Sequence, residues 1–97
     1  MSNATGTVTI DFGAAPGSNE ASVAVTGQGT ISATSKAEAF VMGDSTSSSH
    51  TASDHRYLGQ FCSFTCGTPT AATGFTIYAC STQKLTGTWT LQWVWSD

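Results

Sequence analysis

The stretch that decides the fold is LTGTWTLQWVW, residues 85–95, near the end of the chain. Its bulky apolar side chains alternate strictly with smaller or polar ones; they are Trp89, Leu91, Trp93 and Trp95. Alternation with a period of two is typical of a β-strand that buries one face. Each tryptophan buries about 150–250 Å², and packed sheets lie about 10 Å apart. We therefore expect these rings to fill the core of a thin β-sandwich.

The same alternation recurs along the chain in short runs that Gly, Pro, Asn and Ser separate. In GTVTIDF, residues 6–12, the apolar side chains share one face, and GAAPGSN then supplies turn residues. The sequence predicts an all-β fold, an antiparallel β-sandwich of about six strands with at most one short helical turn. The expected strands lie near residues 5–12, 21–27, 36–42, 58–66, 74–81 and 86–95.

A chain of 97 residues is long enough for one domain, so we expect residues 1–97 to form a single sandwich with a flexible N-terminal arm at residues 1–4. A helical turn is indicated after Thr51, because Asp54 follows it at the spacing of a weak capping box. The residues expected in the core are Val8, Ile10, Phe12, Val23, Val25, Phe64, Phe75, Ile77, Trp89, Leu91 and Trp93.

Charged residues make up only 9% of the chain, and the formal net charge is −3. This balance gives no basic surface for nucleic acid or for an anionic membrane, so neither is an expected partner. No stretch reaches the roughly 18 apolar residues that a membrane span needs. The N-terminus MSNATGTV lacks the features of a signal peptide, so we expect synthesis in a cytoplasm.

The metal-type ligands that cluster in the sequence form one group, Asp44, His50, Asp54 and His55. His50 and Asp54 are four residues apart and would face the same way on a helical turn. No thiolate or third histidine completes a familiar metal site. In the alternative interpretation, Asp54 caps the turn and both histidines lie half-exposed in a loop or a subunit contact. We expect no cofactor.

Catalytic motifs are missing as well. Ser, His and Asp all occur near HTASDH, but no nucleophile elbow of the G-x-S-x-G type is present. Cys62 with His55 could form a nucleophile pair, yet Cys62 shares the predicted core face with Leu58, Phe64 and Cys66, and buried thiols are usually inert. We therefore expect a protein that is not an enzyme.

The three cysteines cannot all be paired within one chain. Cys62 and Cys66 lie four residues apart on one expected strand, hence about 13 Å apart, which is beyond disulfide reach. In GFTIYACS, Phe75 and Ile77 face the core, so Cys80 points the other way. Cys80 is the thiol we expect at a contact with another chain, either bridged to that chain or left free beneath it.

Several apolar side chains are expected on faces that otherwise look outward, and monomers seldom expose such a patch. We expect closed symmetric assembly to cover them. The residues expected at an interface are Phe40, Met42, Tyr78, Cys80 and Val94.

The runs GTVTIDFGAAPGSNEASVAVTGQ, AEAFVMGDST, HTASDHRY, TPTAATGFTIYA and LTGTWTLQWVW together resemble a group of small structural proteins of tailed-bacteriophage virions. The resemblance spans nearly the whole chain and implies a role in the virion, as a capsid decoration or a neck, tail or fibre subunit, in contact with other virion proteins. GFTIYA followed by WTLQWVW is also distantly similar to H-type lectin domains, but no sugar-binding motif of theirs can be placed here. This similarity and the symmetry of phage particles imply a trimer first, with a dimer or hexamer next.

Two functions follow as hypotheses. The first is a non-enzymatic structural component of a bacteriophage virion, made in the bacterial host and assembled as a symmetric oligomer. The second is a carbohydrate-binding module that adsorbs to a host surface. A glycan site would need an exposed aromatic platform beside polar groups. The aromatic residues available outside the expected core are Tyr57, Phe61 and Tyr78.

Overall fold

A computed structural model describes residues 2–97 as six strands and one helix. The elements in chain order are β1 (Asn3–Asp11), β2 (Ser18–Val25), β3 (Lys36–Phe40), α1 (Ala52–Phe61), β4 (Cys62–Cys66), β5 (Phe75–Leu85) and β6 (Thr88–Ser96). The strands form two antiparallel three-stranded sheets. The predicted all-β sandwich of six strands is confirmed.

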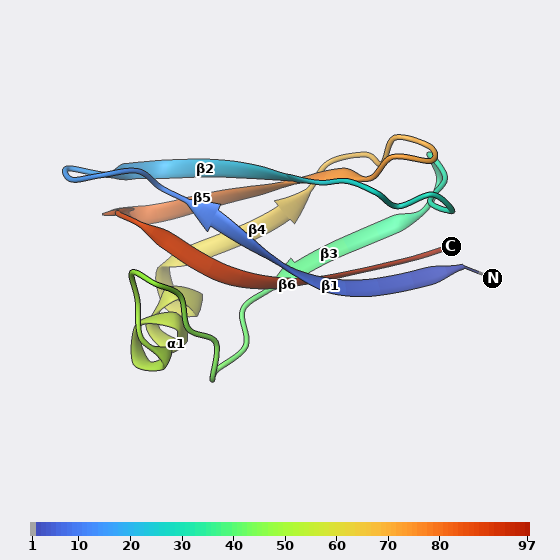
Figure 1. The fold of residues 1–97 in the computed structure, drawn as a ribbon. Coiled ribbons are helices and arrows are strands. Elements are labelled where there is room, and N and C mark those ends of the chain that lie inside the picture. The colour runs from blue at the N-terminus through green and yellow to red at the C-terminus, as the bar shows by residue number, and fades with distance from the viewer. Residues whose placement is uncertain (1) are drawn as a thin grey trace.

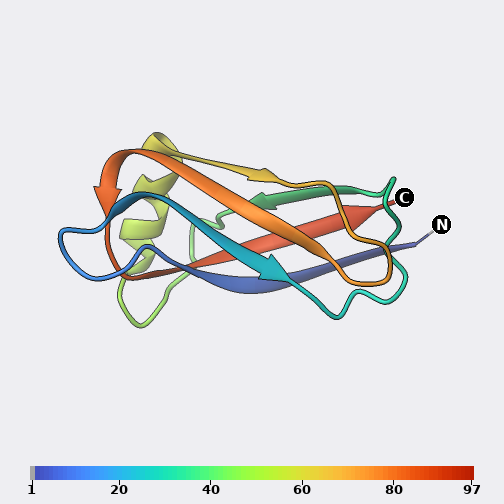
Figure 2. The same ribbon diagram turned by 90° about the horizontal axis from the view of Figure 1, so that it is seen from above.

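The first sheet has the order β1-β6-β3 and the second has the order β2-β5-β4. The two sheets lie face to face, and α1 covers one end of the sandwich while both termini lie at the other (Figure 1). Seen from above, β1 and β2 run along one side and β3 and β4 along the opposite side (Figure 2). The central strands β6 and β5 each pair on both edges. Buried residues alternate with more exposed ones along nearly all of β6, and along β5 as far as Ala79.

The core forms between the two sheets, and the strand alternation predicts most of it. Eight of the expected core residues are buried: Ile10, Phe12, Val25, Phe75, Ile77, Trp89, Leu91 and Trp93. The other three, Val8, Val23 and Phe64, are half-buried and pack against this cluster. Trp95 is buried too, and its Nε1 donates to Gln28 Oε1 at 3.0 Å. The terminal strand therefore buries all three of its tryptophans.

Trp93 shows how closely the first sheet is fitted. It lies opposite Gly6 in the β1–β6 register. A Cβ atom added to Gly6 would come within 2.5 Å of the Trp93 ring. The ring therefore occupies the space that any larger side chain at position 6 would need. Phe75 of the second sheet meets Trp93 edge-on, with ring centroids 5.8 Å apart.

The helix is the main departure from the prediction. α1 is ten residues long, where the sequence predicts at most one turn, and it occupies residues 58–61 of the expected strand 58–66. Its N-terminus is the predicted capping box, because Thr51 Oγ1 accepts from Asp54 N–H and the Asp54 carboxylate accepts from Thr51 N–H. The side chain of Leu58, on α1, is fully buried. Helical packing of Leu58 against the sandwich end thus replaces the expected strand.

The N-terminal segment also differs from the prediction of a flexible arm. β1 begins at Asn3, inside the segment expected to be a flexible arm, because Asn3 and Ala4 pair with β6. The backbone N–H of Asp97 donates to the Ser2 carbonyl at 3.0 Å and continues this pairing. Met1 of the expected arm lies outside the described residues. Across residues 2–97, α1 is too short and too polar to cross a lipid bilayer.

Candidate functional site

The segment between β3 and α1 runs along the half of β6 that β3 does not reach. β3 ends at Phe40, which lies opposite Gln92. Beyond that point the loop bonds to β6 through polar side chains: Thr90 Oγ1 donates to the Thr46 carbonyl at 2.6 Å, and Ser47 Oγ donates to the Thr88 carbonyl. The serine-rich run thus serves as a substitute edge for β6 rather than as a free loop.

His55 completes this substitute edge from inside the fold. Its side chain is fully buried, and its Nε2 accepts from the backbone N–H of Thr90 at 3.0 Å. Its Nδ1 lies 2.8 Å from the Thr51 carbonyl, which can only accept. The ring is therefore neutral with its hydrogen on Nδ1. Both nitrogens are engaged, so His55 is a structural group.

His50 stacks on Trp89 at the helix end, with ring centroids 3.6 Å apart and an interplanar angle of 15°. Its Nε2 donates to the Thr86 carbonyl at 2.6 Å, and its Nδ1 lies 3.3 Å from Asp54 Oδ2. Bonds from Thr51 N–H and from His50 hold the pKa of the Asp54 carboxyl below its ordinary value. The pair ties the start of α1 to the β5–β6 turn.

The four metal-type residues singled out in the sequence do not form one group. His50 and Asp54 contact each other, but His55 points into the core and Asp44 lies 3.6 Å from Arg56 in an exposed ion pair. Within residues 2–97, no three His, Cys, Asp or Glu side chains come together as a metal site would require. The alternative interpretation is right for Asp54, which caps the helix, and wrong for His55, which lies on α1 and is fully buried.

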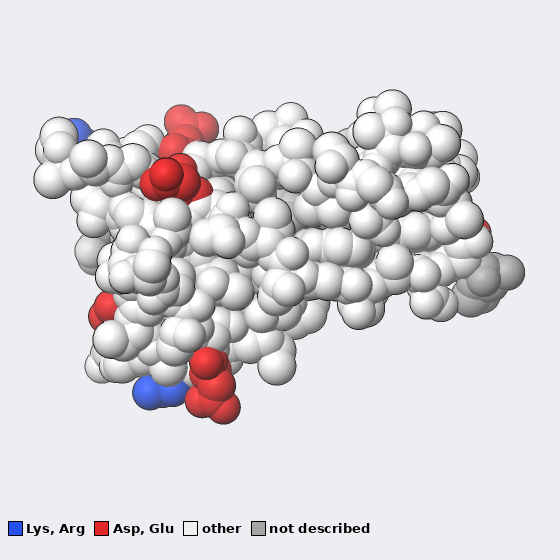
Figure 3. Space-filling view, in the orientation of Figure 1, with Lys and Arg blue, Asp and Glu red and all other residues white. Residues whose placement is uncertain are grey.

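A shallow hollow of about 340 Å³ opens beside this cluster, between α1 and the end of β5. Tyr57 is exposed on one side of it, Phe61 is half-buried beside it, and Lys84 and Asp54 contribute charges of opposite sign. Figure 3 shows charged side chains gathered mostly at this end of the molecule, with most of the face uncharged. The hollow combines aromatic surface with hydrogen-bonding groups.

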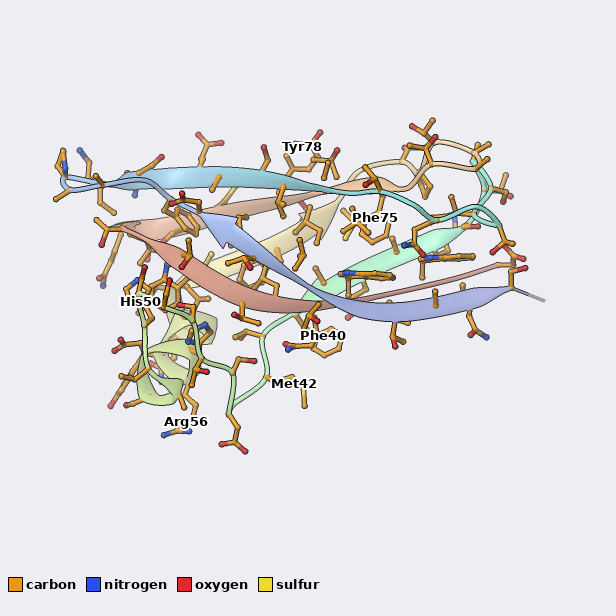
Figure 4. All side chains as sticks on the ribbon, viewed as in Figure 1. Phe40, Met42, His50, Arg56, Phe75 and Tyr78 are labelled. Atoms are coloured by element: carbon orange, nitrogen blue, oxygen red, sulfur yellow. The ribbon has the colours of Figure 1, made fainter. Side chains whose placement is uncertain are left out.

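The outer face of the first sheet carries the exposed apolar residues of the expected interface. Phe40 is 38% exposed and Met42 is 52% exposed. Phe40 lies opposite Gln92, and Val94, half-buried, lies opposite Glu38 on the same face. Figure 4 shows the Phe40 and Met42 side chains pointing away from the sandwich on the same side. These three residues, Phe40, Met42 and Val94, are called the lower apolar patch below.

Tyr78 and Cys80, the other two expected interface residues, are on the opposite outer face. Both are exposed on β5, and Tyr78 lies between Ser22 of β2 and Thr65 of β4. Figure 4 places Tyr78 across the sandwich from Phe40 and Met42. One contact cannot cover both sets, so the expected single interface separates into two surfaces. Alternation along each strand assigns a residue inward or outward but not to a sheet.

The three cysteines are free thiols with different surroundings. Cys62 is buried, Cys66 is half-buried and Cys80 is exposed, so Cys80 faces away from the other two as the alternation predicts. Burial raises the pKa of Cys62 to about 11, with a smaller contribution from Cys80. Burial also raises the pKa of Cys66. Neither inward thiol is a reactive nucleophile at neutral pH.

Comparison of the chain with models of known families, with curated proteins and with solved structures finds no match. The class that the structure defines is the all-β sandwich. Function has to be argued from the surfaces described above, because a fold of this class serves many unrelated roles.

Proposed function

We propose that the chain is a non-enzymatic structural subunit of a bacteriophage virion, assembled as a symmetric homo-oligomer through the lower apolar patch. The observation that carries the proposal is the exposure of Phe40 and Met42 side by side with Val94 on the outer face of the first sheet. Apolar groups of this size gain free energy when a partner covers them. The resemblance of the sequence to virion proteins supports a bacteriophage virion as the particle in which the chain assembles.

The patch suits association that depends little on charge. Near it, Glu38 and Lys36 are the charged side chains on β3, and the whole chain carries only nine charged groups apart from its histidines, three basic and six acidic. Burial of apolar surface supplies about 25 cal/mol per Å², and salt screens it little. Closed symmetry covers the patch on every copy, and the sandwich folds that the sequence resembles make a trimer the state we expect first.

Sedimentation velocity of the purified chain at low and high salt tests the assembly. We expect an oligomer at both, and a Phe40→Ser, Met42→Ser double variant should associate more weakly. Tyr78→Ser is the matched control, because it removes an exposed aromatic ring from the opposite face. Equal behaviour of the two variants would contradict the role of the patch.

The virion role needs a separate test. Density maps of intact particles whose genome encodes this chain should show it at a symmetric site in contact with other virion proteins. Particles that lack the chain altogether would overturn the proposal. A chain that assembles in solution yet is missing from particles would support the homo-oligomer and overturn the virion role.

A second function, glycan binding, is favoured by one observation: the hollow at the helix end brings Tyr57 and Phe61 beside Asp54 and Lys84. Sugars bind where an aromatic ring lies among hydrogen-bonding groups. Tyr78, the third aromatic candidate, lies away from this hollow on the second sheet. Binding to an array of bacterial surface glycans that Tyr57→Ala abolishes, and Tyr78→Ala preserves, would favour this function over the structural one.

A further inference from the structure

The free edge of β1 is an unprotected strand edge. β1 pairs with β6 on one side and with no strand on the other among residues 2–97. At its two ends, Phe12 N–H donates to the Gly87 carbonyl and Asp97 N–H donates to the Ser2 carbonyl. In an antiparallel ladder the direction of these groups alternates. The even-numbered residues of β1 therefore bond to β6.

The odd-numbered residues of β1 consequently direct their backbone groups outward. Thr90, opposite Thr9, confirms this from the other strand, because its N–H points away from β1 to His55. The N–H and C=O groups of Thr5, Thr7 and Thr9 have no backbone partner in residues 2–97, and all three residues are exposed. Figure 1 shows β1 in front of the strands that it crosses.

Other strand edges of the molecule are short, irregular or charged along their length, whereas β1 carries a single charge, Asp11, at its end. β3 and β4 have only five residues each, and β3 carries Lys36 and Glu38. β2 has an irregular register between Ser18 and Glu20, and Glu20 adds a charge. β1 is nine residues long, keeps an unbroken register and has no proline or basic residue. Such an edge is a ready template for another strand.

The side chains of β1 match a second, antiparallel copy of the same strand centred on Thr7. That register places Thr5 opposite Thr9 of the other copy, Thr7 opposite Thr7, and Asn3 opposite Asp11. Threonine pairs of this kind stabilise antiparallel strands, and the Asn3 amide can donate to the carboxylate. The residues brought opposite each other are the odd-numbered ones, whose backbone groups point outward. Backbone and side-chain complementarity therefore agree on one register.

We propose that two copies of this chain associate through the free edges of β1, in antiparallel register about Thr7, so that their first sheets join into one continuous six-stranded sheet. This contact is distinct from the lower apolar patch and does not depend on the chain being a virion subunit. A two-fold edge contact and a three-fold patch contact would together close into a hexamer where the two axes meet at right angles.

A charge-swap pair tests the register. In a Thr5→Lys, Thr9→Lys variant, lysines face each other across the two-fold axis, so the edge contact should weaken about tenfold or more. In the matched Thr5→Lys, Thr9→Glu variant, each lysine faces a glutamate of the other copy, so the contact should persist. Sedimentation velocity measures both, with circular dichroism confirming that each variant is folded. Equal association of the two variants would overturn the register.

Hydrogen exchange gives an independent readout on the wild-type chain. The amides of Thr5, Thr7 and Thr9 should become more slowly exchanging as protein concentration rises. Those of Gly6 and Val8, which bond to β6, should be protected at every concentration. Fast exchange at the three threonines in the assembled state would overturn the proposal.

The oligomer that each variant forms separates the edge contact from the patch contact. Replacing the patch residues, with Phe40→Ser and Met42→Ser, should leave edge-paired dimers. The Thr5→Lys, Thr9→Lys variant should leave patch-linked trimers, so the loss of one contact can be told from the loss of the other.

Discussion

The Nε2 atom of His55 accepts a hydrogen bond from the backbone N–H of Thr90 at 3.0 Å. Thr90 lies on β6 beyond the point where β3 ends, so the imidazole supplies the acceptor that a neighbouring strand would otherwise provide. The same ring bonds to the Thr51 carbonyl at the start of α1. A single buried side chain thus joins the helix to the central strand of the first sheet.

Replacing His55 with alanine should therefore destabilise the fold by about 2–4 kcal/mol, because the half-buried Thr90 loses the acceptor for its N–H and a cavity remains. Urea unfolding at neutral pH measures the loss. Tyr57→Ala is the control on the same helix, because Tyr57 is exposed and should change the free energy of unfolding by less than about 0.5 kcal/mol. Similar losses for both variants would contradict the structural role of His55.

Trp93 and Gly6 should behave as a coupled pair. Trp93→Ala should cost about 3–5 kcal/mol, since it empties the middle of the core. Gly6→Ala should cost about 1–3 kcal/mol, because its methyl group would meet the indole ring. In a Trp93→Leu background, the Gly6→Ala cost should become smaller, and a double-mutant cycle in urea gives the coupling. A cycle with no coupling would contradict the contact.

The three thiols should react in the order of their exposure. At pH 8, iodoacetamide should label Cys80 fastest, Cys66 more slowly and Cys62 last. A pKa of about 11 leaves only about one Cys62 thiol in a thousand ionised at that pH, and burial blocks access as well. Peptide mass spectrometry follows each site over time, and urea-unfolded protein is the control in which the rates should converge. Rapid labelling of folded Cys62 would contradict its burial.

The capping carboxylate should make stability depend on pH. The pKa of Asp54 is lowered from its ordinary value of 3.8 by Thr51 N–H first and His50 next. A lowered pKa stabilises the folded state above about pH 4, and this contribution is lost as the pH falls through the folded-state value. Asp54→Asn should thus be less stable than wild type at pH 6, with the difference shrinking toward pH 3.

Thermal unfolding across that pH range measures the effect. Asp97 contributes in the same direction, because its pKa is lowered by Ser2 N–H and the Ser35 hydroxyl. The Asp54→Asn variant should therefore keep some acid sensitivity of its own. A difference between the wild type and Asp54→Asn that stays constant with pH would refute the assignment to this carboxylate.

The core of the protein could be predicted from the sequence alone because strand alternation is a local property. Ile10 on β1, Phe12 directly after β1, Ile77 on β5 and Leu91 on β6 are flanked by residues that point outward, and all four are buried. The capping box at Thr51 and Asp54 was equally visible, since it needs only residues three apart. The outward direction of Cys80 follows from the same period-two alternation.

The helix length and the surfaces were decided by the tertiary structure. Residues 58–61 contain apolar side chains compatible with either a strand or a helix, and only the packing of Leu58 against the sandwich end selects the helix. Likewise, the alternation that turns Phe40 and Tyr78 outward cannot say that they lie on opposite sheets. Sheet order is set by pairing between residues far apart in the chain, such as Gly6 with Trp93, and local pattern does not encode such pairing.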